Sequence, residues 1–349
     1  MSIPGSDGLP RNTILIGDAR RHLATIPAGA VDTVITSPPY FQLRDYGRKG
    51  QIGLEDHVDG WVDELRAVMG GVARVLKETG SVWLNLGDTY SRQDRYGAPP
   101  KSLLLGPERL ALRLIDDGWT IRSKVIWAKT AAMPNPVRDR LTCAWEVVYL
   151  LTRTRRYYFD LDRIRVPHRS ARRPARQAEP PPGVGKRPSW AGPLAGSNAG
   201  LDRMKARGVV GHPLGKNPTD VWALPVSNFR GAHHATFPTN LVERPLLATC
   251  PERTCRKCGE PWRRLPAKHR GTVASLGSLQ PGCDCRAGWS PGLVLDPFFG
   301  AGTVGVVAEA HQRDWLGIEL NPAFARIAEQ RIVRARTDTR DGSRHAPAA

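Results

Sequence analysis

A Ser-Pro-Pro-Tyr tetrapeptide follows directly on a β-branched apolar segment near the start of the chain. Val31–Thr36 (VDTVIT) is typical of a buried strand, and Ser37, Pro38, Pro39 and Tyr40 come immediately after it. Two prolines fix φ and remove two N–H donors, so the carbonyls there are free to accept from a ligand. The serine hydroxyl adds an acceptor, and the tyrosine adds an aromatic face. These groups could hold a planar ligand through its amino hydrogens.

A glycine-rich loop late in the chain is the second group of residues that could do chemistry. Leu293–Leu295 is a predicted strand, DPFFGAGT (296–303) is the loop, and TVGVVAEA begins a predicted helix. Glycines let the backbone approach a ligand closely, and such a loop lies at the carboxyl end of its strand. The phosphate-binding P-loop is excluded because no Gly-Lys-Ser/Thr follows. Glu319 ends the next predicted strand, where an acidic residue can bind two ribose hydroxyls.

Five of the six cysteines are concentrated in one short stretch. They include a CxxC pair and a CxC pair separated by 24 residues, and a glycine follows the first pair. Two close thiolate pairs predict a structural, tetrahedral Zn²⁺ site of the zinc-knuckle kind. Cys250 is a spare candidate ligand, and free thiols or redox cysteines are the alternatives. The predicted zinc ligands are Cys255, Cys258, Cys283 and Cys285.

Alternating strand and helix patterns must position these residues. Strand-like segments are predicted at 13–16, 31–36, 81–88, 121–129, 145–151, 293–295 and 314–320, and helical segments follow Gly17 and cover 61–77, 103–117, 303–310 and 321–336. This alternation favours an α/β fold built on a mostly parallel sheet.

The segment from Arg163 to Lys216 departs from this pattern. It is rich in Arg, Pro and Gly and has little apolar periodicity, so it is expected to be a mobile basic loop that builds no core of its own.

Length and charge narrow the class of protein. The 349 residues are enough for one large α/β domain or two smaller ones. A net charge of +18 favours a polyanionic partner, although a solvated basic tail is the alternative. No apolar run is long enough to span a bilayer, and the polar N-terminus lacks a secretory pattern. We therefore expect no membrane association and a cytoplasmic protein.

The two motifs together resemble those of amino-directed DNA methyltransferases. DPFFGAGT is similar to that family's DPFxGxGT loop, and Ser37–Tyr40 is similar to its (D/N/S)PP(Y/F) motif. The early tetrapeptide and late loop match the order of the β class, and the similar blocks cover roughly 11–160, 219–249 and 292–335. The resemblance implies a Rossmann-like methyltransferase fold, with helices on both faces of a mostly parallel sheet.

The resemblance also implies S-adenosylmethionine as the cofactor and assigns residues to it. Phe298 and Gly300 would wrap its methionine end, Glu319 would take the ribose hydroxyls, and Asn321 would lie near the adenine. Asp18 would accept from the adenine amino group, with a helix N-cap as the alternative. The implied cofactor residues are Asp18, Phe237, Pro238, Asp296, Pro297, Phe298, Gly300, Gly302, Thr303, Glu319 and Asn321; the implied catalytic residues are Ser37, Pro38, Pro39 and Tyr40.

The resemblance and the cysteine spacing together predict five segments along the chain. The catalytic domain would comprise 11–160, 219–249 (the cofactor-packing segment, with HATFP at 234–238) and 289–337. A basic target-recognition insert would occupy 161–218, and a Cys-rich zinc insert 250–288.

A serine in the first position of the tetrapeptide usually accompanies methylation of cytosine N4 within this family. Ser37 therefore predicts site-specific cytosine-N4 methylation of double-stranded DNA, with adenine N6 as the alternative. More remote alternatives are an RNA or protein-amide methyltransferase and a non-enzymatic zinc-containing DNA-binding protein. If the enzyme serves a restriction–modification system, a separately acting endonuclease is a further expected partner.

Overall fold

Two compact units make up the chain in the computed structural model, which describes residues 8–168, 212–227, 237–265, 267–269 and 272–340. The first unit comprises Met1–Asp160, Thr219–Arg263 and Gln280–Ala349, and the second comprises Leu161–Pro218 and Arg264–Leu279. Most of the predicted basic insert, 169–211, lies outside the described residues, as do residues 234–236 of the HATFP segment.

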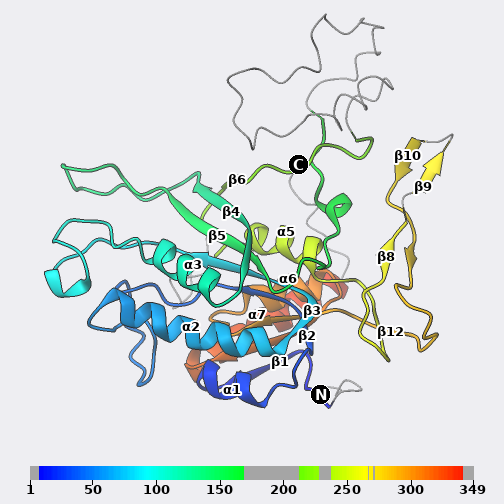
Figure 1. The fold of residues 1–349 in the computed structure, drawn as a ribbon, viewed down its shortest axis with the longest axis horizontal. Coiled ribbons are helices and arrows are strands. Elements are labelled where there is room, and N and C mark those ends of the chain that lie inside the picture. Colours follow the sequence, from blue (N-terminus) through cyan, green and yellow to red (C-terminus); the bar gives the residue numbers. More distant parts are fainter. Residues whose placement is uncertain (1–7, 169–211, 228–236, 266, 270–271, 341–349) are drawn as a thin grey trace, which may run out of the picture. The chain divides into compact units, whose positions relative to one another are not determined.

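An eight-stranded sheet forms the centre of the first unit. Its spatial order is β1-β14-β13-β2-β3-β5-β4-β6 (Figure 1). β5 runs antiparallel to both of its neighbours, and every other neighbouring pair is parallel. The predicted mostly parallel α/β sheet is confirmed. The strands are β1 (Thr13–Ile16), β2 (Val31–Thr36), β3 (Leu76–Leu86), β4 (Thr120–Lys129), β5 (Trp145–Thr152), β6 (Val221–Leu224), β13 (Leu293–Asp296) and β14 (Asp314–Glu319).

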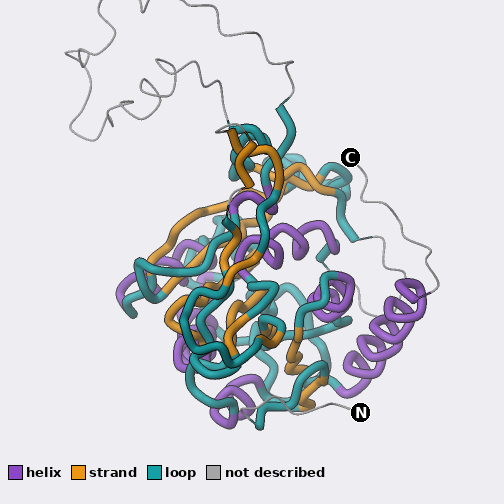
Figure 2. Tube along the Cα trace, turned by 90° about the vertical axis from the view of Figure 1, so that its right-hand side faces the viewer, coloured by secondary structure: helices purple, strands orange, loops and turns teal. Residues whose placement is uncertain are grey.

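Helices cover both faces of this sheet, as expected. Successive residues of a strand point to opposite faces, so Val34 and Ile35 on β2 enter two different apolar clusters. One cluster joins the sheet to α1, α2 and α3, and the other joins it to α5, α6 and α7. Figure 2 shows helices on either side of the strands. The helices are α1 (Ala19–Thr25), α2 (Val58–Val75), α3 (Gly106–Asp116), α5 (Thr239–Thr249), α6 (Thr303–Ala310) and α7 (Pro322–Arg340).

Two helices begin three residues away from their predicted starts, and one helix was not predicted. α2 begins at Val58, three residues early, because the His57 ring accepts from the Asp59 N–H and caps it. α3 begins at Gly106 because the Asp88 carboxylate accepts from the N–H groups of Leu105 and Gly106. α5 was not predicted, since a proline inside it at Pro245 interrupts the helical pattern.

Short elements complete the described chain. In the first unit β7 (Thr254–Cys255) pairs antiparallel with β12 (Trp289–Ser290). In the second unit β9 (Ala267–His269) pairs with β10 (Thr272–Ser275), and Arg165 contacts Asp162 and Asn217. The remaining elements are η1 (Asp94–Tyr96), η2 (Leu161–Ile164), β8 (Arg263–Arg264) and β11 (Leu279–Gln280). Among the described helices, none is both long and apolar enough to cross a bilayer.

Candidate active site

The sheet brings the tetrapeptide and the glycine-rich loop together. β2 and β13 are parallel neighbours, with Thr33 opposite Val294 and Val34 opposite Leu295. Their carboxyl ends therefore meet at one edge of the sheet, and the loops that follow them emerge side by side. The Thr36 hydroxyl donates to Asp296 Oδ1 at 2.6 Å and joins the two strand ends directly.

A cavity of about 550 Å³ lies at this edge, within the size range of small-molecule sites. Both loops line it, so the tetrapeptide and the glycine-rich loop share one cleft. Of the predicted site residues, those that line the cavity are Ser37, Pro38, Pro39, Tyr40, Asp18, Phe237, Pro297, Phe298, Gly300, Thr303, Glu319 and Asn321.

Pro238, Asp296 and Gly302 are not among the residues that line the cavity; each instead supports the surrounding structure. Asp296 is 1% exposed and also accepts from the Phe298 N–H at 3.0 Å. Burial raises the pKa of this carboxyl to about 7. Gly302 has φ +74° at the start of α6, and a Cβ there would lie 2.7 Å from that of Ala328. Pro238 is buried at the position that precedes α5.

Glu319 shapes the glycine-rich loop from the neighbouring strand. Its Oε2 accepts from the Gly300 N–H and its Oε1 from the Asn321 N–H, both at 2.7 Å. Desolvation raises the pKa of this carboxyl, and the two backbone donors oppose that shift. Each carboxylate oxygen has a further lone pair, so these bonds leave Glu319 able to accept from two hydroxyls.

Asp18 is the N-cap of α1, as the sequence allowed. Its side chain accepts from the Arg20 N–H at 2.8 Å, and the Arg20 guanidinium binds both of its oxygens. The hydrogen bond from that guanidinium lowers the pKa of Asp18. Because Asp18 also lines the cavity, the cap does not conflict with a role in binding the adenine amino group.

The segment after the tetrapeptide contributes residues that the sequence did not single out. Tyr46 lines the cavity and packs edge-on against Phe324 of α7, with ring centroids 6.1 Å apart. Arg48 donates to Asn321 Oδ1 at 3.1 Å. These contacts connect the chain after β2 to the residues that follow β14, so this part of the cavity is assembled from two distant segments.

The backbone around the tetrapeptide is fixed by two contacts. The Trp61 indole N–H donates to the Pro39 carbonyl at 2.9 Å, so this carbonyl already has a donor. The Tyr40 ring packs directly on Gly87, where a Cβ would lie 2.6 Å from Cε2 of the ring. Gly87 is therefore needed to give the ring its place beside the end of β3.

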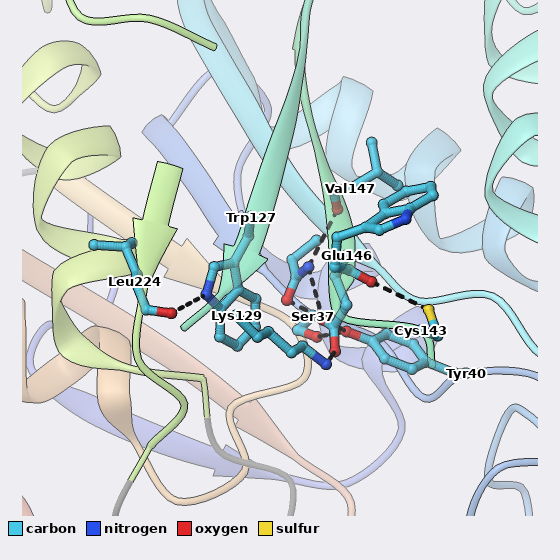
Figure 3. Close-up of polar contacts among 10 residues, drawn as sticks. Ser37, Tyr40, Trp127, Lys129, Cys143, Glu146, Val147 and Leu224 are labelled. Carbon is cyan, nitrogen blue, oxygen red and sulfur yellow. Dashed lines mark hydrogen bonds and ion pairs between the residues drawn. The ribbon is translucent and has the colours of Figure 1, made fainter. Parts of the chain in front are cut away.

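A polar network surrounds the Tyr40 hydroxyl (Figure 3). Tyr40 Oη donates to Glu146 Oε2 at 2.6 Å and lies 3.1 Å from Ser37 Oγ. Burial first, and then the Glu146 carboxylate, raise the pKa of Tyr40, which keeps the phenol protonated. Asn85 Nδ2 donates to Glu146 Oε2 at 3.1 Å, and Lys129 Nζ donates to Oε1 at 2.6 Å.

Sequence analysis missed Asn85, Lys129 and Glu146. A signal was present, because each is a polar residue in, or at the end of, a strand of apolar residues: WLNL, VIWAK and WEVV. A buried polar side chain in such a strand needs a partner, which is a reason to look for a site.

The four predicted zinc ligands lie together in the first unit. The sulfur atoms of Cys255, Cys258, Cys283 and Cys285 are all within 4.8 Å of one another. N–H groups near Cys255 lower the pKa of its thiol to about 6, and Lys257 N donates to Cys255 Sγ at 3.4 Å. Cys250 is not in this group; it is fully buried in the apolar cluster beside α5.

The strand order, and a cavity at the carboxyl ends of adjacent central strands, place the protein in the class of Rossmann-like α/β enzymes that bind a nucleotide-type cofactor. The N6/N4 DNA methylase family model matches residues 31–330. The chain belongs to this family.

Similar proteins agree with this placement. The type II methyltransferase M.SmaI of Serratia marcescens is 31% identical over 93% of this chain and 91% of its own length. M.Cfr9I of Citrobacter freundii is 33% identical over 92% of this chain and 87% of its own length. Among solved structures, the cytosine-N4-specific PvuII DNA methyltransferase shares the fold with a TM-score of 0.56 at 19% identity, covering 94% of this chain and 92% of that one.

The fold is also shared with TTHA0409 of Thermus thermophilus, solved in complex with S-adenosyl-L-methionine. Its TM-score is 0.50 at 22% identity, covering 93% of this chain and 95% of that one. The protein is thus an S-adenosylmethionine-dependent DNA methyltransferase of the family that modifies exocyclic amino groups.

Proposed function

We propose that this enzyme methylates the exocyclic N4 of cytosine in DNA. The observation that carries the proposal is the identity and position of Ser37, the first residue of the tetrapeptide, whose side chain lies at the cavity. The shared fold with a cytosine-N4-specific enzyme supports the same choice.

The residues of the tetrapeptide suit an extruded base. The target base leaves the stack and packs on the Tyr40 ring. Ser37 Oγ and the Pro38 carbonyl accept from the two amino hydrogens, while the Pro39 carbonyl stays with Trp61. Accepting both hydrogens favours a pyramidal amine with its lone pair exposed, and positioning supplies most of the acceleration. The bound cofactor would supply the methyl group from its sulfonium and leave as S-adenosylhomocysteine, and the methylated amine loses one proton.

The experiment is methylation of duplex DNA by the purified enzyme, followed by digestion to nucleosides and mass spectrometry. N4-methylcytosine is expected. N6-methyladenine would overturn the choice of base and leave the reaction class intact, and Ser37→Ala is the inactive control.

We also propose that the cavity residues keep the cofactor roles that the family resemblance implies. Glu319 takes the ribose hydroxyls with its remaining lone pairs, Asp18 and Asn321 lie at the adenine, and Phe237 packs against the cofactor. Glu319→Ala should weaken S-adenosylmethionine binding about tenfold or more in a calorimetric titration, because two hydroxyls lose their acceptor. An unchanged affinity would refute this assignment.

We further propose that the four clustered cysteines bind a structural Zn²⁺. Sulfurs around one tetrahedral Zn²⁺ stand roughly 3.8 Å apart, given Zn–S bonds of about 2.3 Å. Four sulfurs within 4.8 Å of one another need only a small adjustment to reach this spacing. Elemental analysis of purified protein should give one zinc per chain, and a metal-free, fully active protein would contradict the proposal.

A further inference from the structure

We propose that Glu146 is a positioning residue that fixes the direction of the hydrogen bond between Tyr40 and Ser37, so that the Ser37 oxygen faces the target amine only as an acceptor. This inference rests on the proposed role of Ser37 in holding the amino group.

Three hydrogen-bond donors hold the Glu146 carboxylate in place. Its Oε1 accepts from Lys129 Nζ at 2.6 Å, and its Oε2 accepts from Tyr40 Oη at 2.6 Å and Asn85 Nδ2 at 3.1 Å (Figure 3). The side chains of Lys129 and Glu146 are only 22% and 13% exposed. The Glu146 carboxylate has no proton to give, so it can only accept.

The direction of the next bond follows from counting protons. A tyrosine hydroxyl has one proton, and Tyr40 gives it to Glu146 at 2.6 Å in preference to the neutral Asn85 Oδ1 at 3.3 Å. Tyr40 Oη can then only accept. The contact of 3.1 Å between Tyr40 Oη and Ser37 Oγ is therefore donated by Ser37.

This direction matters for amine methylation. With its proton turned toward Tyr40, the Ser37 oxygen presents only lone pairs to the cavity and accepts from an amino hydrogen. A Ser37 proton pointing the other way would compete for the amine lone pair that must attack the methyl group. Glu146 thus acts through two hydroxyls without touching the reacting atoms.

Glu146→Gln should reverse the network at almost constant size. Lys129 can only donate, so it attracts the oxygen of the new amide, and the NH₂ group then faces Tyr40. Tyr40 would accept from that group and donate to Ser37 Oγ at 3.1 Å, which is nearer than Asn85 Oδ1 at 3.3 Å, leaving the Ser37 proton free to point into the cavity. We expect kcat to fall about 100-fold, the size of losing one preorganised hydrogen bond to the reacting group, with cofactor affinity and KM for DNA unchanged.

The decisive test is a double-mutant cycle with Tyr40→Phe, which keeps the aromatic ring and removes the linking hydroxyl. Tyr40→Phe alone should lower kcat about tenfold, because the Ser37 proton loses its acceptor. In the Tyr40→Phe background, Glu146→Gln should cost little more. An equal loss in both backgrounds, or Tyr40→Phe with wild-type kcat, would overturn the proposal.

A matched control comes from β4, the strand that carries Lys129. Lys124 of β4 pairs with Glu108 at 2.7 Å, outside the cavity lining, so Glu108→Gln removes a comparable ion pair and should leave kcat unchanged. Mass spectrometry of the product tests the choice of base separately from the role of Glu146. If the methylated base proves to be adenine, the proposed base is wrong, and the cycle still tests whether Glu146 acts through Tyr40.

Discussion

The hydroxyl of Thr36 donates a 2.6 Å hydrogen bond to Oδ1 of Asp296, a residue 260 positions further along the chain. Both side chains are buried, at 2% and 1% exposure. The bond joins the last residues of β2 and β13, from which the tetrapeptide and the glycine-rich loop depart. It therefore fixes the spacing of the two halves of the active site.

Thr36→Val should loosen this connection. The substitution keeps the shape and leaves Asp296 with one fewer buried donor, so we expect about 2 kcal/mol lower stability, together with weaker cofactor binding. Chemical denaturation and calorimetric titration measure the two effects. Thr36→Ser, which keeps the hydroxyl, is the control, and a Thr36→Val protein as stable as wild type would contradict the assignment.

Asp296 should make stability depend on pH. Burial raises the pKa of its carboxyl from an ordinary value of 3.8 to about 7 in the folded protein. The folded state thus holds this proton more tightly than the unfolded state. The contribution of the protonated carboxyl to the free energy of unfolding is complete below about pH 4 and is lost as the pH rises through about 7. Asp296→Asn removes the cost of ionising a buried carboxyl. The free energy of unfolding of the variant should therefore exceed that of wild type by on the order of 2–4 kcal/mol at pH 8. Urea unfolding at pH 4 should show no such difference.

Gly87→Ala should damage catalysis. The new methyl group would lie 2.6 Å from the Tyr40 ring and push the ring out of place. Since misplacing a reacting group by about 1 Å can cost about 100-fold, we expect a fall of that order in kcat. Gly70→Ala, in α2 with nothing within 4 Å of the new Cβ, should instead stabilise the protein by about 0.5–1 kcal/mol and leave kcat intact. Equal behaviour of the two variants would refute this explanation.

Lys77 neutralises a buried carboxylate. Its Nζ lies 2.7 Å from Asp32 Oδ1, Asp32 is 3% exposed, and the Leu293 N–H donates to Oδ2 at 2.8 Å. Lys77→Met leaves an uncompensated buried charge beside the first residue of β13 and should cost about 3 kcal/mol in denaturant unfolding. Lys101→Met breaks a pair of similar length with the exposed Asp139 and should change little.

Replacing a proposed zinc ligand should change zinc content and Tm, whereas replacing a cysteine outside the cluster should change neither. Cys258→Ser removes one of four clustered sulfurs and should release the metal and lower Tm by about 10 °C. Cys143→Ser changes an exposed cysteine outside the cluster and should do neither. Colorimetric zinc release and scanning calorimetry follow both variants, and identical zinc content in the two would argue against the site.

The sequence indicated both motifs because each is local. Ser37–Tyr40 and 296–303 follow apolar strands, and their prolines and glycines restrict the backbone wherever they occur. The four clustered cysteines were recognisable for the same reason. The sequence did not indicate α5, where Pro245 breaks the pattern, nor did it assign a role to Glu146.

By itself the sequence determined the α/β class, the mostly parallel sheet and the residues at the ends of two strands, since periodicity and backbone restriction act over a few residues. Only the tertiary structure decided that Asp296 faces Thr36 rather than the cavity and that Lys129, Glu146 and Asn85 converge on Tyr40. The physical reason is that strand order and register place side chains from distant segments together, and hydrogen bonds form only between atoms brought within about 3 Å.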